Sequence, residues 1–311
     1  MQKRKSMKAT MQSRNMVWLA MVSVPMILLI LFKYIPMGGI IIAFKKYRFS
    51  DGIFGSEWVG LKNFSTFLMS KDLWVLLRNT IGYNVLFIIT SLIASVFVAM
   101  LLYELRSRFA TKIYQTVMIT PHFVSMIIVG YIAYAFLNPS SGVINKVLTS
   151  IGLKPVEWYS ESTVWPFILS FVNIWKGVGM SSVIYYAALM GIDASIFEAA
   201  DIDGANRWQK YVYVLVPCLI PTIVILLVLN VGSILGGDFG LFYYITRDVG
   251  ALRQSTDIIN TYTMRLFRGK DVSVNYSLST AISLIQSVVG VVLVTVTNKI
   301  SKMLDEDLGL F

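Results

Sequence analysis

The chain has 311 residues, of which 56% are hydrophobic and only 14% are charged, and its formal net charge is +10. A soluble globular domain carries nearly twice that density of charge, so the composition indicates a membrane protein. The single cysteine, Cys218, excludes a disulfide framework and a cysteine zinc cluster. The single histidine, His122, excludes metal sites and catalytic mechanisms that need two or more histidines.

Six apolar stretches are long enough to cross a membrane. The hydrocarbon core of a bilayer is about 30 Å thick, which a helix spans with roughly 20 apolar residues. Four stretches contain no Asp, Glu, Lys or Arg, a fifth carries Lys33 near its end, and a sixth is interrupted only by Lys176. Because backbone groups cannot stay unpaired in lipid, we expect an all-α membrane protein. Its six transmembrane helices are expected at about residues 15–44, 80–102, 113–137, 162–192, 211–237 and 272–298.

The distribution of positive charge predicts how these helices are oriented. Five Lys and Arg residues precede the first span, which is longer than the apolar run of a cleaved signal peptide. The segments on the N-terminal side of the membrane hold 12 Lys and Arg residues and those on the other side hold 13, but the former are much shorter and more densely charged. Both termini are therefore expected in the cytoplasm. The expected organisation is a cytoplasmic N-terminus at 1–14, a six-helix membrane domain at 15–301, a cytoplasmic tail at 302–311, and ordered caps over the outer face at 45–79 and 238–271.

Sequence motifs for catalysis and for nucleotide binding are absent. The chain has no G-x-x-x-x-G-K-[ST] phosphate loop, no H-E-x-x-H and no G-x-S-x-G. Its expected spans contain no Asp or Glu, which proton-coupled carriers place within the membrane. We therefore expect a protein that is not an enzyme and that holds no metal or cofactor of its own. Its energy would come from a partner that binds a docking surface.

The segment 193–210, between the fourth and fifth expected spans, is the candidate for that surface. Ser195 and Glu198 have the S-x-x-E spacing of a capping box, which predicts a short helix that starts near residue 196. Ala200 and Gly204 are four residues apart, so one side of that helix is nearly bare and lets another protein approach its backbone closely. From the residues alone, an ordinary interfacial helix with Glu198 as a cap is an equal alternative.

The residues of this segment also follow a recognisable series: Glu198-Ala199-Ala200, then Gly204, then Val214-x-Val216-Pro217. The series resembles the EAA loop of binding-protein-dependent ABC importer permeases, with valine in place of the Ile and Leu of its trailing I-x-L-P element. Further stretches resemble the carbohydrate-type permeases, in the branch that handles polysaccharide-derived oligosaccharides. These stretches are residues 34–45, 58–64, 104–108, 121–125, 175–179 and 257–262.

This resemblance implies a type I ABC importer permease fold, with a cytoplasmic coupling helix between the fourth and fifth spans. The implied partners are a second permease subunit, two ATP-binding subunits that hold ATP and Mg²⁺, and an extracellular solute-binding protein, which is a lipoprotein in Gram-positive relatives. The implied function is import of oligosaccharides across the cytoplasmic membrane of a bacterium, in contact with lipid and without nucleic acid. The implied ATPase-coupling residues are Glu198, Ala199, Ala200, Asp203, Gly204 and Ala205.

Polar and aromatic side chains within the spans are candidates for a sugar path, because a sugar needs hydrogen-bonding groups and aromatic surfaces for its apolar face. Each of them is also explained by a hydrogen bond between helices. Lys176 would suit an anionic oligosaccharide, whereas snorkelling near a helix end explains it equally well. The candidates are Asn173, Trp175, Lys176, Tyr185, Asn230 and Gln286.

Two other functions fit the sequence. A permease of the same class for a non-sugar solute, such as a phosphate ester or an amino acid, would share the docking loop. A membrane scaffold that docks a soluble partner and moves no solute would explain the bare helix, but not the polar groups within the spans. Whether an ATPase co-purifies with the chain distinguishes the scaffold hypothesis from the two transporter hypotheses.

Overall fold

Long apolar helices make up most of the fold. The computed structural model describes residues 2–105, 107–269, 273–305 and 309. In these ranges, five helical stretches are long and apolar enough to cross a membrane, and two shorter helices form a sixth, broken span. The six predicted crossings are therefore present when the broken pair counts as one. Residue 272, where the last span was expected to begin, and half of the predicted tail at 302–311 lie outside the described residues.

The spans are built from the following elements. The first consists of α1 (Gln2–Leu29), the π-helix η1 (Ile30–Tyr34), α2 (Ile35–Met37) and the 3₁₀ helix η2 (Gly38–Phe44). The second is α5 (Leu73–Glu104), and the third is the pair α6 (Arg108–Phe123) and α7 (Met126–Leu137). The fourth is η3 (Ser162–Val164) with α9 (Trp165–Met190). The fifth is α11 (Arg207–Lys210), η4 (Tyr211–Leu215) and α12 (Val216–Gly232), and the sixth is α15 (Tyr276–Leu304).

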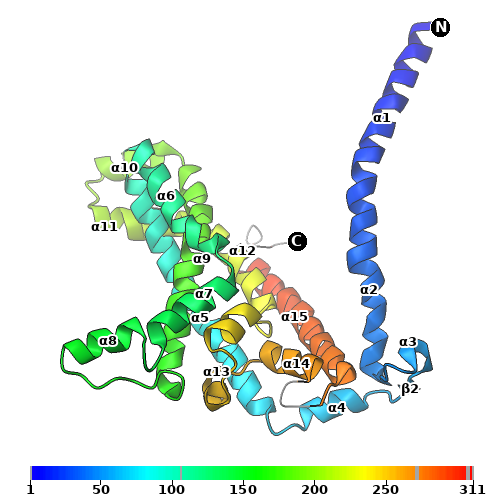
Figure 1. The fold of residues 1–311 in the computed structure, drawn as a ribbon. Coiled ribbons are helices and arrows are strands. Elements are labelled where there is room, and N and C mark those ends of the chain that lie inside the picture. Colours follow the sequence, from blue (N-terminus) through cyan, green and yellow to red (C-terminus); the bar gives the residue numbers. More distant parts are fainter. Residues whose placement is uncertain (1, 106, 270–272, 306–308, 310–311) are drawn as a thin grey trace.

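Short elements cover the two ends of the spans. The strands β1 (Lys45–Lys46) and β2 (Glu57–Trp58) pair antiparallel, with Lys45 opposite Trp58. The other short elements at this end are α3 (Gly52–Gly55), α4 (Lys62–Leu68), α8 (Val143–Ser150), η5 (Leu241–Ile245), η6 (Gly250–Leu252), α13 (Arg253–Thr256) and α14 (Ile259–Arg268). The opposite end carries α10 (Ala194–Ile202). Figure 1 shows the N-terminal end of α1 on the same side as α10, and α3, α4, α8 and α13 on the other. Residues 45–79 and 238–269 thus form short ordered elements, as expected for these parts of the two caps.

The third span is not the continuous helix over 113–137 that its composition predicts. Its two halves are bent by 93° between Phe123 and Met126. Val124 and Ser125 have extended backbone, and the Ser125 hydroxyl caps α7 by accepting from the backbone N–H of Ile128. The predicted crossing is therefore present as a broken pair of helices and not as one helix. A hydropathy criterion tolerates one serine within an apolar run and predicts that the helix continues through it. Here the serine caps a new helix.

Several helix ends differ from the apolar stretches that predict them. α5 begins at Leu73 rather than 80, and α15 continues to Leu304 rather than ending at 298. Both extensions carry charged residues. A hydropathy criterion excludes such residues from a span, whereas a helix that continues beyond the lipid can contain them. The fifth span ends at Gly232, and a turn at 233–235 followed by irregular backbone at 236–237 replaces the last part of the expected helix.

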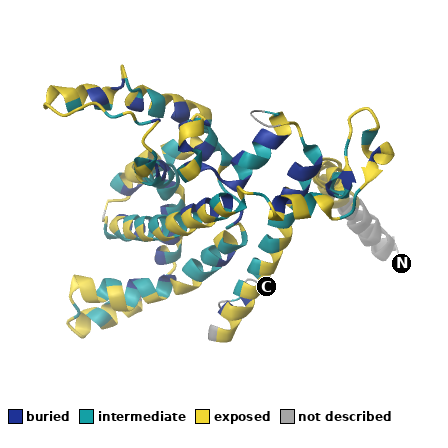
Figure 2. Cartoon of the chain, turned by 90° about the horizontal axis from the view of Figure 1, so that it is seen from below, coloured by how far each residue is buried: buried dark blue, intermediate teal, exposed yellow. Residues whose placement is uncertain are grey.

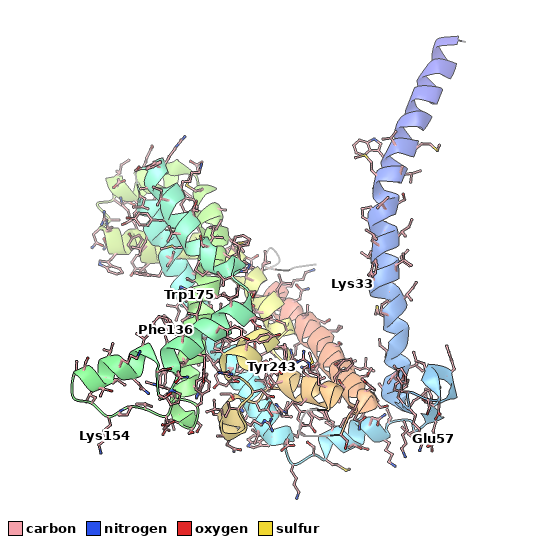
Figure 3. The ribbon with its side chains drawn as sticks, in the orientation of Figure 1. Lys33, Glu57, Phe136, Lys154, Trp175 and Tyr243 are labelled. Atoms are coloured by element: carbon pink, nitrogen blue, oxygen red, sulfur yellow. The ribbon has the colours of Figure 1, made fainter. Side chains whose placement is uncertain are left out.

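The part of the first span formed by α1, η1 and α2 stands apart from the other helices, whereas η2 packs against α15 (Figure 1). Every residue from 16 to 38 is exposed, although this stretch is strongly apolar. Lys33 lies on this isolated helix (Figure 3). Elsewhere, buried residues gather where helices meet (Figure 2), in three apolar clusters. The surface of α1 must therefore be covered by lipid or by another protein.

A buried ion-pair network stabilises the cap formed by residues 238–269. The guanidinium of Arg265 on α14 pairs with Asp248 at 3.2 Å and with Asp257, and all three residues are at least nine-tenths buried. The Asn79 side chain on α5 donates to the backbone oxygen of Asp257 at 3.0 Å. Burial lowers the pKa of Arg265, but hydrogen bonds and attraction from Asp257 and Asp248 outweigh it and raise that pKa above its usual value. Sequence reasoning did not identify this network.

Candidate functional site

A polar cavity of about 410 Å³ lies between α5, α9 and α12. Such a volume is typical of small-molecule pockets. Phe87 and Tyr185 give the cavity aromatic surface, and its amide and hydroxyl groups match the hydroxyls of a polar ligand. The polar lining residues are Asn84, Ser91, Ser95, Asn173, Ser181, Tyr185, Asn230 and Asp238.

Three of the six predicted path residues meet in this cavity. Asn173 and Tyr185 come from α9, and Asn230 comes from α12. The Asn173 side chain donates to the Ser91 hydroxyl at 3.0 Å, which ties α9 to α5 across the cavity wall. The structure therefore brings these side chains together, and their contact with a solute stays a prediction.

Lys176 lies instead at the break in the third span. Its ammonium donates to the backbone oxygens of Pro121, His122 and Val124 at 2.5 to 3.3 Å. These oxygens are at the C-terminal end of α6, where helix carbonyls lack partners and a positive charge is favourable. The break itself thus accounts for a half-buried lysine in a span, without an anionic ligand.

Trp175 and Gln286 lie outside the first cavity. Trp175 on α9 (Figure 3) is 39% exposed and does not line the cavity that Asn173 and Tyr185 line. Gln286 on α15 lines a second, open cavity of about 530 Å³ against α14. Its amide donates to the backbone oxygen of Leu235 at 2.5 Å and to the side chain of Asn260 at 2.8 Å. The six predicted path residues therefore do not form one group.

The docking loop 193–210 contains the short helix that the sequence predicts, but with a different cap. α10 begins at Ala194, and the carboxylate of Asp193 accepts from the backbone N–H of Ser195 at 2.9 Å. The predicted capping box of Ser195 and Glu198 was wrong, because a charged acceptor already occupies the cap position two residues earlier. Hydrogen bonds from the backbone and side chain of Ser195 lower the pKa of Asp193. A capping box does occur in this loop, at Asn206 and Gln209.

Gly204 ends α10 in the left-handed conformation, with φ of +71°. The N–H of Gly204 donates to the oxygen of Asp201 at 3.1 Å, and that of Ala205 donates to Ala200 at 3.0 Å, which is the Schellman pattern. A side chain at 204 would meet no atom of this chain within 4 Å. Among the six predicted coupling residues, Glu198, Ala199, Asp203 and Gly204 are exposed, and Ala200 and Ala205 are half-buried.

The docking loop also exposes apolar residues that the sequence reasoning missed. Ile202 is 87% exposed and Trp208 is 73% exposed, one on each side of Gly204. Large apolar side chains in an otherwise polar loop mark a surface that another protein covers. The sequence signal for this surface is the presence of large apolar residues in a short charged segment, whereas the motif of the loop consists of small residues.

Comparison with known proteins identifies the family. Residues 91–308 match the family described as binding-protein-dependent transport system inner membrane component. The protein LplB of Bacillus subtilis is 36% identical over 297 residues, which cover 94% of this chain and 91% of LplB. The polygalacturonan/rhamnogalacturonan transport system permease protein YteP of Bacillus subtilis is 32% identical, over 89% of this chain and 85% of YteP.

A solved structure also matches this chain over nearly its whole length. It is the crystal structure of a bacterial ABC transporter involved in the import of the acidic polysaccharide alginate. One of its chains matches with a TM-score of 0.83 and 31% identity, and the match covers 94% of this chain and 97% of that one. The chain therefore belongs to the family of binding-protein-dependent transport system inner membrane components.

Proposed function

We propose that this chain is a permease subunit of an ATP-driven importer of oligosaccharides, which an extracellular binding protein delivers. The observation that carries the proposal is the cavity between α5, α9 and α12, where amides, hydroxyls and aromatic rings are gathered within membrane-spanning helices. A sugar binds through both kinds of group, by hydrogen bonds and by stacking of its apolar face.

The names of related proteins support a plant or algal polysaccharide fragment as the solute. YteP is named for polygalacturonan and rhamnogalacturonan, and AraP of Halalkalibacterium halodurans for arabinooligosaccharides. Another solved structure that matches this chain is the alginate transporter in complex with a periplasmic protein that holds an alginate pentasaccharide. Among the residues that the structure describes, Asp238 is the one charged side chain that lines the cavity. The ammonium of Lys176 is bound by backbone oxygens. Both features favour a neutral oligosaccharide at this cavity over an acidic one.

The proposal includes partners that supply energy and complete the path. Two ATP-binding subunits bind ATP and Mg²⁺, and one of them docks on the loop 193–210. A second permease subunit covers the open side of the cavity and the apolar surface of α1. This chain then carries out no covalent chemistry, and both of its termini lie in the bacterial cytoplasm. ATP-bound and ATP-free partners must stabilise different states of the permease, since a ligand indifferent to conformation shifts no equilibrium.

Uptake competition tests the solute. Cells that express the importer are given a labelled neutral arabinooligosaccharide in competition with oligogalacturonide, alginate oligosaccharide or glycerol 3-phosphate. An excess of unlabelled arabinooligosaccharide serves as the neutral competitor. We expect this neutral sugar to reduce the labelled uptake and the other three compounds to leave it unchanged. Competition by the two acidic sugars would contradict the preference for a neutral sugar that is drawn from Asp238. Competition by glycerol 3-phosphate alone would indicate a phosphate ester, and not a sugar, as the solute.

Substitutions of Gly204 test the docking loop. Gly204→Asn and Gly204→Asp are expected to remove most of the co-purifying ATPase and of the uptake, because their side chains project where the partner approaches. Gly204→Ala is expected to have a smaller effect, because its side chain is short. The remaining effect comes from the left-handed backbone, which costs alanine about 1–2 kcal/mol. The measurement is the amount of ATPase that co-purifies in mild detergent. Retention of the ATPase by Gly204→Asn with loss by Gly204→Ala would mean that glycine serves the backbone turn alone, since asparagine tolerates this conformation.

A further inference from the structure

A carboxylate at the end of the second span contacts the docking loop and the start of the fifth span. Glu104 is the last residue of α5, and its side chain is 27% exposed. One of its oxygens lies 3.2 Å from Nε of Arg207 on α11 and also accepts a hydrogen bond from the hydroxyl of Tyr211. Arg207 lies in the last part of the docking loop, on α11, and Tyr211 follows directly on η4, so both belong to the start of the fifth span. Glu104 therefore joins two spans at the base of the loop.

The coupling helix α10 contacts the same end of α5. The ring of Phe197 on α10 lies 5.7 Å from the ring of Tyr103, the neighbour of Glu104. A second ion pair, between Asp201 on α10 and Lys210 on α11, holds the two helices of the loop together. The loop therefore meets α5 at two adjacent residues and is braced internally, so its helices are expected to move as one unit.

The same helix, α5, forms one wall of the cavity. Ser91, Leu92 and Ser95 line the cavity, and Ser95 lies nine residues before Glu104, about 14 Å along a helix. No glycine or proline occurs between residues 91 and 104, so this part of α5 has no residue that favours a kink. An apolar cluster that contains Tyr103 and Phe197 also contains Leu92 and Tyr185, which line the cavity.

We propose that Glu104 is a positioning residue that transmits movement of the docking loop to the cavity wall on α5. The proposal rests on the function proposed above, because it needs an ATPase that moves the loop. When the ATPase subunits displace α10, the pair of Glu104 and Arg207 pulls the end of α5 with it, and the cavity lining moves. Without that pair, α5 follows the loop only through apolar packing, namely the ring contact of Tyr103 and the contact of α5 with α9.

Accessibility of the cavity wall gives a test that needs no sugar. Ser91→Cys in a Cys218→Ser background provides one thiol on the cavity wall of the complete importer, in lipid nanodiscs. The rate of its reaction with a small thiol reagent is measured without nucleotide and after trapping with MgATP and vanadate. The trapped state should change this rate in the otherwise native chain. Glu104→Ala should reduce that change by about 2- to 30-fold, the usual range for residues that carry coupling.

Further variants separate transmission from folding. Glu104→Ala should co-purify with the ATPases as well as the native chain does, and it should consume more ATP for each labelled arabinooligosaccharide transported. Glu104→Arg combined with Arg207→Glu should restore much of both readouts. Glu161→Ala, an exposed carboxylate at the other end of the molecule, should change neither.

Two results would overturn the assignment. An unchanged thiol response in Glu104→Ala would mean that α5 moves without this residue, and loss of the ATPases would mean that Glu104 only folds the loop. Absence of sugar uptake in the native importer with an intact thiol response would contradict the proposed solute and leave the assignment of Glu104 supported.

Discussion

Arg265→Met is expected to lower the free energy of unfolding by about 3–5 kcal/mol, the cost of leaving a buried charge without its partner. The Arg265 side chain is only 6% exposed, and its guanidinium contacts Asp248 and Asp257. Methionine keeps the apolar stem but removes the positive charge, so the carboxylate of Asp257 loses its guanidinium in a site that excludes most water. The Thr261 hydroxyl, which donates to Asp257 at 2.6 Å, cannot replace a charge.

Arg268→Met is the matched control, because Arg268 lies one turn later on the same helix and is exposed. It donates to the Tyr243 hydroxyl at 3.2 Å and lies 5.5 Å from that ring. Such an exposed contact contributes about 0.5–1 kcal/mol. Thermal unfolding of the two variants in detergent, followed by tryptophan fluorescence and size exclusion, measures the difference. Equal shifts would contradict a stabilising role of the buried network.

The network also predicts how stability responds to alkaline pH. The pKa of Arg265 is raised in the folded protein, so the stability that its charge provides is fully present below the pKa of an unfolded arginine. That stability is lost only as the pH rises toward the still higher folded value. Across the pH range in which membrane proteins are handled, Arg265 is therefore expected to contribute a constant amount.

The positions of the spans could be predicted from sequence because lipid imposes a simple rule on length and polarity. The ends of α5 and α15 could not, since outside the lipid that rule no longer applies and helices continue through charged residues. The break at residues 124–125 was missed for a related reason. Hydropathy averages over about twenty residues, whereas a serine cap and a lysine from α9 act at single positions.

The short helix of the docking loop could be predicted from the sequence, whereas the grouping of the path residues could not, for a physical reason. The features of a coupling loop are local, so the spacing of Glu198, Ala200 and Gly204 is visible in one segment. A cavity joins residues from three helices, and the rotation of each helix decides which side chains meet. Asn173 and Tyr185 face α5 and α12 while Trp175, between them in sequence, does not. The network of Arg265 likewise joins residues 17 positions apart, which no local pattern records.

Gly179→Ala is expected to destabilise the contact between α6 and α9 by about 1–3 kcal/mol, the usual effect of overpacking. A methyl group at 179 would lie 1.9 Å from the backbone oxygen of Met118 and 2.9 Å from the backbone nitrogen of Ile119. Helical backbone cannot yield by that amount, so α6 must move away from α9. Such a movement would also draw Pro121 and Val124 away from Lys176, because their oxygens lie at the end of α6.

Gly177→Ala provides the control, two residues away on the same helix. A methyl group at 177 would meet no atom within 4 Å, because this position faces the cavity. It is expected to leave thermal unfolding unchanged or to raise the midpoint, since alanine favours a helix over glycine by roughly 0.5–1 kcal/mol. The two variants change the composition identically and differ only in the face that receives the methyl group. Lowered midpoints for both would therefore assign the effect to helix α9 itself, and a lowered midpoint for Gly179→Ala alone assigns it to the close approach of α6.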